Sequence, residues 1–356
     1  MDATKAMDAV NRAFETEAPV EGQFTPERRE IRVRVYCCGG TGMKNGLRFR
    51  HNSQKDGLRH LDFAFLDTSD SDLPAGVPAE ELHLFRGIEG GGKDRQYAYQ
   101  QVAPKIPEAL QKFPPADFNI ILHSGSGASG PSIGPALVAQ LMEQNKFVLV
   151  IQTGSVGSKK EVTNTIGSFR TYANFAEDFG RPVLKFYREA NETTTRKQVD
   201  EDVQSALMLC AMLFSSENRG IDTKDLEHLI DYHKVTSFRP ELSSFEFHSR
   251  EISLPENAIP QAAAVLYSND ENFEDVREVN TYLEYRADGF MNPVRSKQLG
   301  GRLPIYFVAF TGDLKERLAG LERRRQGFEA IEQARSNQNA SVATTGGDRR
   351  KGSIVF

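Results

Sequence analysis

The sequence predicts an α/β fold built on a parallel sheet, with a second, smaller α+β part towards the C-terminus. Between residues 31 and 195, short apolar runs recur along the chain. Each run ends in glycine, serine or other polar residues, and a stretch with helical spacing follows it. Strands that alternate with helices form βαβ units, and ligands of such sheets bind at the carboxyl ends of the strands. The polar turns therefore mark the expected binding edge.

Each element follows from its apolar pattern. The predicted strands of the parallel sheet are 31–38, 61–66, 118–122, 147–152 and 182–187. A long helix over 195–214 comes next, and its apolar second half indicates that it is sandwiched between two layers. The predicted elements beyond it are a short helix over 226–234, strands over 245–254, 262–267, 281–285 and 304–310, and a charged helix over 314–334.

These elements divide the chain into segments. Residues 1–30 are predicted to form an N-terminal extension, which could be either a flexible tail or a partner-binding helix. The following segments are a ligand-binding domain over 31–195, a central helix over 196–219, an α+β domain over 220–312, a helix over 313–335 and a tail over 336–356. The tail has few large apolar residues before its last three and should be disordered when free.

Composition excludes several classes of protein. The 356 residues are 39% apolar and carry a formal charge of −5, which gives no argument for nucleic-acid binding. Cys37, Cys38 and Cys210 lie in apolar runs and read as buried reduced thiols, and no Cys/His spacing suggests zinc. Because a signal peptide and an apolar run of about 20 residues are both missing, we expect a cytosolic protein without membrane contact.

Three glycine-rich turns predict a phosphate site. They are Gly-Gly-Thr-Gly at 39–42, Glu-Gly-Gly-Gly-Lys-Asp-Arg at 89–95 and Ser-Gly-Ser-Gly-Ala-Ser-Gly at 124–130. Glycines let backbone N–H groups approach a phosphate, and a following helix N-terminus adds its dipole. One such turn is usually only a tight turn, whereas three on one sheet indicate a site. The G-x-x-x-x-G-K-[ST] pattern is absent, and 39–44 fails the dinucleotide pattern because Lys44 stands at its last position.

Taken together, these motifs resemble the tubulin/FtsZ family, whose signature is G-G-G-[TS]-G-[ST]-G. The closer resemblance is to the phage-encoded tubulins, and it covers about residues 31–250. The matching pieces are 39–43, 65–68, 90–92, 104–107 and 118–135. Ser126 and Ala128 depart from the signature and cost some backbone freedom. The resemblance implies a Rossmann-like parallel-sheet GTPase domain with bound GTP or GDP and Mg²⁺.

The resemblance assigns roles by motif position. The α- and β-phosphates would contact Gly40, Thr41, Gly42 and Met43, with Thr68 nearby. The γ-phosphate would lie against Gly90, Gly91 and Gly92, and the phosphate chain in the cradle of Gly127, Ser129 and Gly130. Asp67, at a strand end, would help to hold Mg²⁺ through water, and a plain turn cap is the other interpretation.

Three residues around the start of the long helix would recognise the base. A carboxylate at Asp200 could accept both the N1–H and the 2-amino group of guanine, and Asn191 resembles the second base-reading residue. Arg196 stands where the family often has a stacking aromatic, and its planar guanidinium could stack too. A helix-dipole role for Asp200 stays open.

Asp222 and Asp225 lie three residues apart at a predicted helix start. The spacing alone fits an N-cap and a first-turn acid equally well. In the family this loop enters the nucleotide pocket of the next subunit, where the acids position the attacking water. The resemblance therefore implies a head-to-tail homopolymer whose GTPase sites are completed between subunits.

Other functions stay open at this point. A phage spindle that positions phage DNA in the host bacterial cytoplasm rests on resemblance, and a non-polymerising nucleotide-binding regulator is the alternative. A dinucleotide-dependent enzyme is disfavoured because no catalytic His, Tyr-Lys or Cys set is visible, and His123 suits strand-end packing. The basic tail, with Arg349, Arg350 and Lys351, could bridge to a neighbouring subunit or simply stay solvated. No direct nucleic-acid partner is expected.

Overall fold

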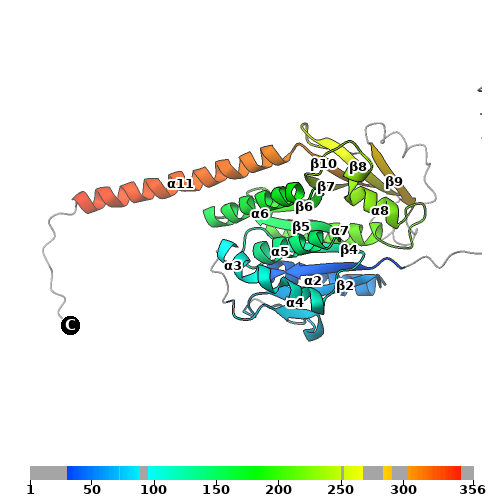
Figure 1. Cartoon of the computed structure of the whole chain (residues 1–356). Coiled ribbons are helices and arrows are strands. Elements are labelled where there is room, and N and C mark those ends of the chain that lie inside the picture. The colour runs from blue at the N-terminus through cyan, green and yellow to red at the C-terminus, as the bar shows by residue number, and fades with distance from the viewer. Residues whose placement is uncertain are drawn as a thin grey trace, which may run out of the picture. The chain divides into compact units, whose positions relative to one another are not determined.

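The computed structural model describes residues 30–71, 73–88, 95–249, 252–267, 284–290 and 304–345. The described residues from Ile31 onwards form one compact unit by their contacts. In the described ranges this unit holds one sheet of ten strands, in the order β3-β2-β1-β4-β5-β6-β7-β10-β8-β9 (Figure 1). The strands are β1 Val33–Cys38, β2 Leu61–Asp67, β3 Leu82–Leu84, β4 Phe118–Ser124, β5 Phe147–Ser155, β6 Val183–Ala190, β7 Leu242–Ser249, β8 Ile259–Tyr267, β9 Tyr285–Phe290 and β10 Ile305–Thr311.

The first six strands are parallel, which confirms the predicted fold class. β1 pairs with β2 on one side and with β4 on the other. The strand order reverses at this point, so the turns after β1 and β4 open side by side at the carboxyl edge of the sheet. A crevice at such a switch point is the usual ligand site of an open α/β sheet.

Helices cover both faces of the sheet. They are α2 Gly39–Lys55, α3 Arg95–Val102, α4 Ile106–Lys112, α5 Gly130–Glu143, α6 Lys159–Asp178, α7 Arg196–Leu213, α8 Thr223–Ile230 and α11 Leu314–Thr345, with short 3₁₀ turns at Ala79–Glu81, Ala103–Lys105 and Tyr232–Lys234. Val35 and Cys37 of β1 face a core shared with α2, α7 and α8. Tyr36 and Cys38 face a second core, shared with α4, α5 and α6. This alternation is the period of two that a strand imposes.

The C-terminal strands extend the same sheet. β7 pairs parallel with β6 at Val183↔Leu242, whereas β10 lies antiparallel between β7 and β8. The predicted strand over 281–285 falls mainly outside the described residues, and the structure instead has β9 at Tyr285–Phe290. The separate α+β domain over 220–312 stays a prediction. In the structure, the strands of this segment continue the first sheet.

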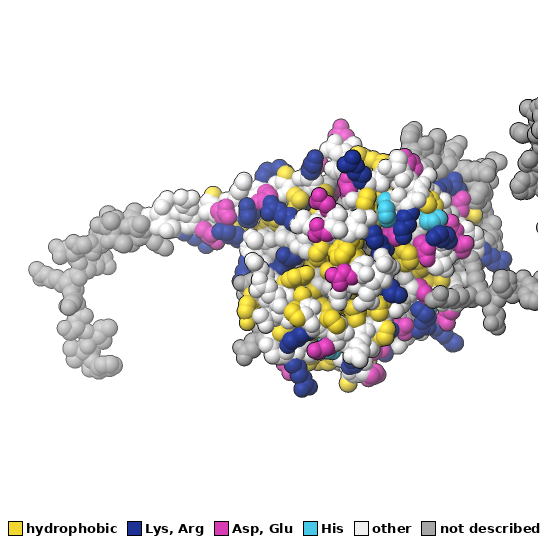
Figure 2. Space-filling view, in the orientation of Figure 1, with side chains coloured by type: hydrophobic (Ala, Val, Ile, Leu, Met, Phe, Trp, Pro, Cys, Tyr) yellow, Lys and Arg dark blue, Asp and Glu magenta, His cyan; other side chains and the backbone are white. Residues whose placement is uncertain are grey.

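α11 is longer than predicted. The expected end near residue 334 is wrong, because the helix continues to Thr345. No glycine or proline occurs between Gly327 and Gly346, so nothing in the sequence stops it earlier. Lys159 of α6 pairs with Glu332, and Arg170 of α6 pairs with Glu322. Figure 2 shows acidic and basic side chains intermixed along this helix.

The predictions for the two ends of the chain stay untested. Residues 1–29, most of the N-terminal extension, and residues 346–356, with the basic end of the tail, lie outside the described residues. None of the described helices combines the length and apolar character that crossing a membrane requires.

Candidate functional site

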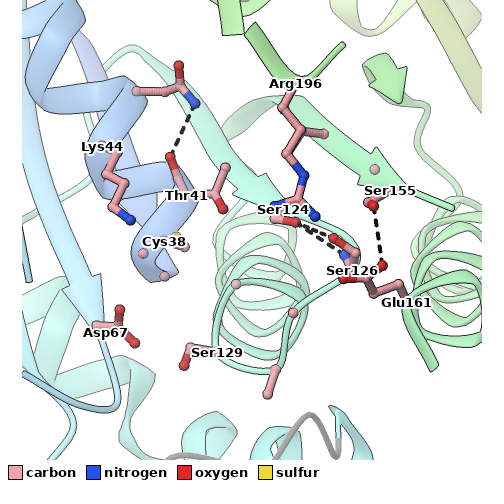
Figure 3. Close-up of a pocket in the computed structure, with 18 of the residues that line it drawn as sticks. Cys38, Thr41, Lys44, Asp67, Ser124, Ser126, Ser129, Ser155, Glu161 and Arg196 are labelled. Carbon is pink, nitrogen blue, oxygen red and sulfur yellow. Dashed lines mark hydrogen bonds between the residues drawn. The ribbon is translucent and has the colours of Figure 1, made fainter. Parts of the chain in front are cut away.

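A cleft of about 820 Å³ opens at the switch point of the sheet (Figure 3). Its walls come from the start of α2, the turn after β2, loop 124–130, the end of β5 and the start of α7. Most of the predicted binding residues line it: Gly40, Thr41, Asp67, Gly127, Ser129, Gly130, Arg196 and Asp200. Segments that are far apart in the sequence therefore form one site, as the strand-end argument predicts.

Two helices point uncapped N-termini at this cleft. Neither α2 nor α5 has a side-chain hydrogen bond at its N-cap, whereas Ser158, Thr195 and Asp222 cap α6, α7 and α8. The first backbone N–H groups of a helix need partners, and the dipole adds positive potential at that end. Two bare helix starts that line one cleft are suited to bind an anion.

Gly39 allows these two helix starts to meet. Its φ is +71°, and a Cβ at this position would lie 2.7 Å from the backbone N of Gly130. A larger residue would be strained by the left-handed backbone and would push α2 and α5 apart. α2 begins directly at this glycine, so residues 39–42 form its first turn.

Side chains behind loop 124–130 hold it in shape. Ser126 N donates to Ser124 Oγ at 3.2 Å, and Asn164 Nδ2 donates to the Gly127 carbonyl at 2.8 Å. Thr68 Oγ1 and Ser129 Oγ lie 2.8 Å apart, so the turn after β2 is tied to the loop. A Cβ on Gly127 would meet no atom within 4 Å, which leaves this part of the loop open to the cleft.

The cleft carries charges of both signs. Arg196 reaches from α7 towards Ser124 and Ser126, while Lys44 lies near the start of α2 (Figure 3). Glu161 accepts a hydrogen bond from Ser155 Oγ at 3.2 Å and also lines the cleft. Lys44 and Glu161 line the cleft but are not among the residues predicted from the sequence. For Lys44 the signal is its position three residues after Thr41 on the same helix face.

Asn45 also lines the cleft without having been predicted from the sequence. It is buried, and its Nδ2 donates to Asp200 Oδ1 at 2.8 Å and to the Thr41 carbonyl at 3.3 Å. Gln204 Nε2 donates back to the Asn45 carbonyl at 3.0 Å. Asn45 therefore links α2 to α7 and holds the Asp200 carboxylate in the wall of the cleft.

We expect Asn45→Ala to lower the free energy of unfolding by about 1–3 kcal/mol, because the partners of a buried amide lose their hydrogen bonds. Gln54→Ala, at an exposed site on the same helix, should change it by less than about 0.5 kcal/mol. Urea titrations followed by circular dichroism measure both variants. Equal stability of the two variants would show that the Asn45 contacts contribute nothing.

Several predicted residues do not line the cleft. Met43 is fully buried in the core, and a Cβ on Gly42 would lie 2.5 Å from the Leu122 carbonyl, so Gly42 lets α2 pack on β4. Asn191 Oδ1 accepts from the backbone N of Thr193 and Thr194 and closes its own turn. Thr68 contacts the loop through Ser129. Gly90, Gly91 and Gly92 lie outside the described residues.

Asp222 and Asp225 form a capping box at the start of α8. Asp222 Oδ1 accepts from the backbone N of Lys224 and Asp225, and Asp225 Oδ2 accepts from Asp222 N. The N-cap interpretation of their spacing is thus confirmed. They follow the C-terminus of α7, whereas Arg196 and Asp200 lie at its N-terminus. The 18 residues of α7 span roughly 27 Å at 1.5 Å per residue, so the acids are far from the cleft of their own chain.

The buried thiols match the prediction from composition. Cys37, Cys38 and Cys210 are free and buried, and burial raises the pKa of each thiol. In the described ranges, no group of three or more His, Cys, Asp or Glu side chains could hold a metal ion by itself. A cation in the cleft would need ligands from its substrate or from water.

Comparison with known proteins agrees with this geometry. No protein-family model matches the chain. A phage tubulin-like protein of Pseudomonas phage PhiPA3 is 28% identical over 244 residues, which are 67% of this chain and 74% of that protein. The protofilament of TubZ from bacteriophage PhiKZ has a TM-score of 0.73 at 23% identity and covers 91% of this chain and 96% of its own. The phage tubulin PhuZ with GDP has a TM-score of 0.72 at 19% identity, over 92% and 96%. The chain is therefore similar in sequence to phage tubulin-like proteins and has the fold of the phage tubulins of the tubulin/FtsZ superfamily.

Proposed function

We propose that the protein binds GTP and GDP in the cleft, polymerises head to tail, and hydrolyses GTP at sites completed by the next subunit. The observation that carries this proposal is that the phosphate site and the acidic pair lie at opposite ends of α7. Uncapped helix starts lie at one end of α7, and an acidic pair lies at the other. Neither end has both the phosphate site and the acids, but stacked subunits would bring the two together.

Nucleotide binding follows from the lining of the cleft. The phosphates would lie against the bare N-termini of α2 and α5, with Lys44 and Arg196 supplying positive charge. Asp200, held by Asn45, would accept the two adjacent N–H donors of guanine. The cleft volume of about 820 Å³ is in the usual range for small-molecule sites. The GDP complex of the similar phage tubulin PhuZ supports this choice of ligand.

The cleft also fits a nucleotide-bound Mg²⁺. Asp67 is buried at the end of β2 and lines the cleft beside the hydroxyl-bearing Ser69 and Ser71. Mg²⁺ commonly takes one or two carboxylates together with substrate phosphates and waters, so one acidic residue suffices here. When bound, the ion would neutralise phosphate charge, and Asp67 would hold it through water.

Hydrolysis would use the acids of the neighbouring subunit. Asp222 is exposed, and its Oδ1 alone accepts both cap hydrogen bonds. A carboxylate carried into the facing cleft could orient a water for attack on the γ-phosphate. Phosphoryl transfer depends mainly on such positioning and on charge stabilisation. The protofilament of the similar TubZ supports longitudinal assembly of this fold.

Light scattering tests the assembly proposal. GTP should raise scattering only above a critical protein concentration, and turnover per subunit should rise with protein concentration in the same range. Electron microscopy with a slowly hydrolysed analogue should show filaments. The absence of scattering at any concentration would contradict assembly, and turnover independent of concentration would contradict a shared active site.

One observation favours the alternative of a non-polymerising nucleotide-binding regulator. The capping box already accounts for the spacing of Asp222 and Asp225 without catalysis. In that case nucleotide would bind with no assembly.

A spindle role in an infected bacterial cytoplasm, and a tail that reaches a neighbouring subunit, are further parts of the proposal. Fluorescence imaging of the tagged protein during infection tests the first, and deletion of residues 340–356, which should raise the critical concentration, tests the second.

A further inference from the structure

A buried lysine lies behind the phosphate-binding loop, outside the lining of the cleft. Lys185 of β6 is 3% exposed, and its Nζ donates to Gln152 Oε1 at 3.1 Å rather than to a carboxylate. The amine also lies 2.8 Å from the ring centroid of Phe169, with Tyr172 and Tyr187 within 6 Å. Burial lowers the pKa of Lys185 well below its usual value. Because burying an amine is costly, its presence calls for an explanation.

The partner of this lysine faces the loop. Gln152 of β5 is fully buried, and its Nε2 has no hydrogen-bond partner in the described structure. A Cβ on Gly125 would lie 2.0 Å from that nitrogen. A side chain at residue 125 would require the amide of Gln152, which occupies this space, to move.

Lys185 determines which end of the amide faces the loop. The Lys185 amine is the donor in the hydrogen bond to Gln152 Oε1, so the amide oxygen faces Lys185 and the –NH₂ group faces Gly125. On the other flank, His123 Nδ1 donates to the Ser124 carbonyl at 3.0 Å, and Tyr172 donates to His123 Nε2 at 2.7 Å. Burial lowers the pKa of His123 to about 3, so this histidine stays neutral. Donors thus back the loop from both sides.

We propose that Lys185 is a positioning residue for phosphate binding and acts through Gln152. By keeping an N–H donor against the back of loop 124–130, it adds positive potential behind the surface that receives the phosphates. Without the lysine, the amide can turn over and present its oxygen, which would repel an anion. This inference rests on the proposed function, because it requires phosphates in the cleft.

The experiment compares Lys185→Met with the exposed control Lys55→Met by calorimetric titration with GDP and with guanosine. Methionine fills the aromatic surroundings without an amine, so the melting temperature of Lys185→Met should stay the same or rise. Its affinity for GDP should fall about tenfold, and its affinity for guanosine should not change. Loss of affinity for both ligands in the same proportion, or a lower melting temperature with wild-type GDP affinity, would overturn the proposal.

A double-variant cycle checks the route through the amide. Gln152→Leu should weaken GDP binding about as much as Lys185→Met, and the double variant should be no weaker than Gln152→Leu alone. Additive losses would show that Lys185 acts independently of Gln152 and would overturn the route. If the wild-type protein binds guanosine and GDP equally or not at all, the proposed function fails, and this inference fails with it. Wild-type binding with an unaffected Lys185→Met overturns the inference alone.

Discussion

Asp222→Asn is expected to slow GTP turnover about 100-fold, the usual loss when a positioned acid or base is removed, without unfolding α8. The geometry of the helix cap lets this substitution remove the charge and keep the hydrogen bonds. A single oxygen of Asp222 accepts from the backbone N of both Lys224 and Asp225, and an asparagine oxygen can accept both bonds. Only the charge is lost, so the free energy of unfolding should change by less than about 1 kcal/mol.

Asp225 is a less suitable position for the same test. Its Oδ2 accepts from Asp222 N, and its Oδ1 lies 3.2 Å from the Tyr285 hydroxyl, which also donates to the Asp225 carbonyl, so an amide here would alter two contacts together with the charge. Glu227→Gln is the matched control, because it removes a carboxylate from α8 that pairs only with the exposed Lys224 among the described residues. Turnover is measured by phosphate release above the critical concentration. Equal rates for Asp222→Asn and Glu227→Gln would reduce the acidic pair to a helix cap.

The sheet and its binding edge could be predicted from the sequence. Runs such as 118–122 and 147–152 are long, apolar and closed by polar turns, and both became central parallel strands. Their order in space could not be predicted, because pairing depends on contacts between distant segments. The insertion of β10 between β7 and β8 is an example, since nothing local to 304–310 selects its two neighbours.

Where the lining of the cleft differs from the predicted set of residues, helix geometry accounts for much of the difference. Residues 39–42 were expected to form a loop, but they form the first turn of α2. Helical periodicity then directs Thr41 and Lys44 to the cleft and sends Met43 into the core. Asn45 was missed because its partner Asp200 lies 155 residues away, at the far side of the interface between α2 and α7. Asn191 does not line the cleft, because its side-chain oxygen accepts hydrogen bonds from the backbone of its own Asx turn.

Gly127→Asp is expected to weaken GDP binding about 100-fold while leaving the fold intact. A Cβ at residue 127 would meet no atom within 4 Å, and the residue lines the cleft, so stability should change by less than about 0.5 kcal/mol. The new carboxylate would stand beside the phosphates. Like charges about 4 Å apart repel by up to about 4 kcal/mol near a protein surface, and a loss of about 2.7 kcal/mol corresponds to 100-fold.

Gly127→Ala separates charge from backbone effects at the same position. Its methyl group also falls in open space, and an alanine already occupies position 128 of this loop, so GDP affinity should fall no more than about threefold. Thermal denaturation and titration calorimetry on both variants complete the comparison. If the aspartate variant binds GDP as well as the alanine variant does, the phosphates do not lie over this part of loop 124–130. The starts of α2 and α5, which have no side-chain cap, would then suit a different anion.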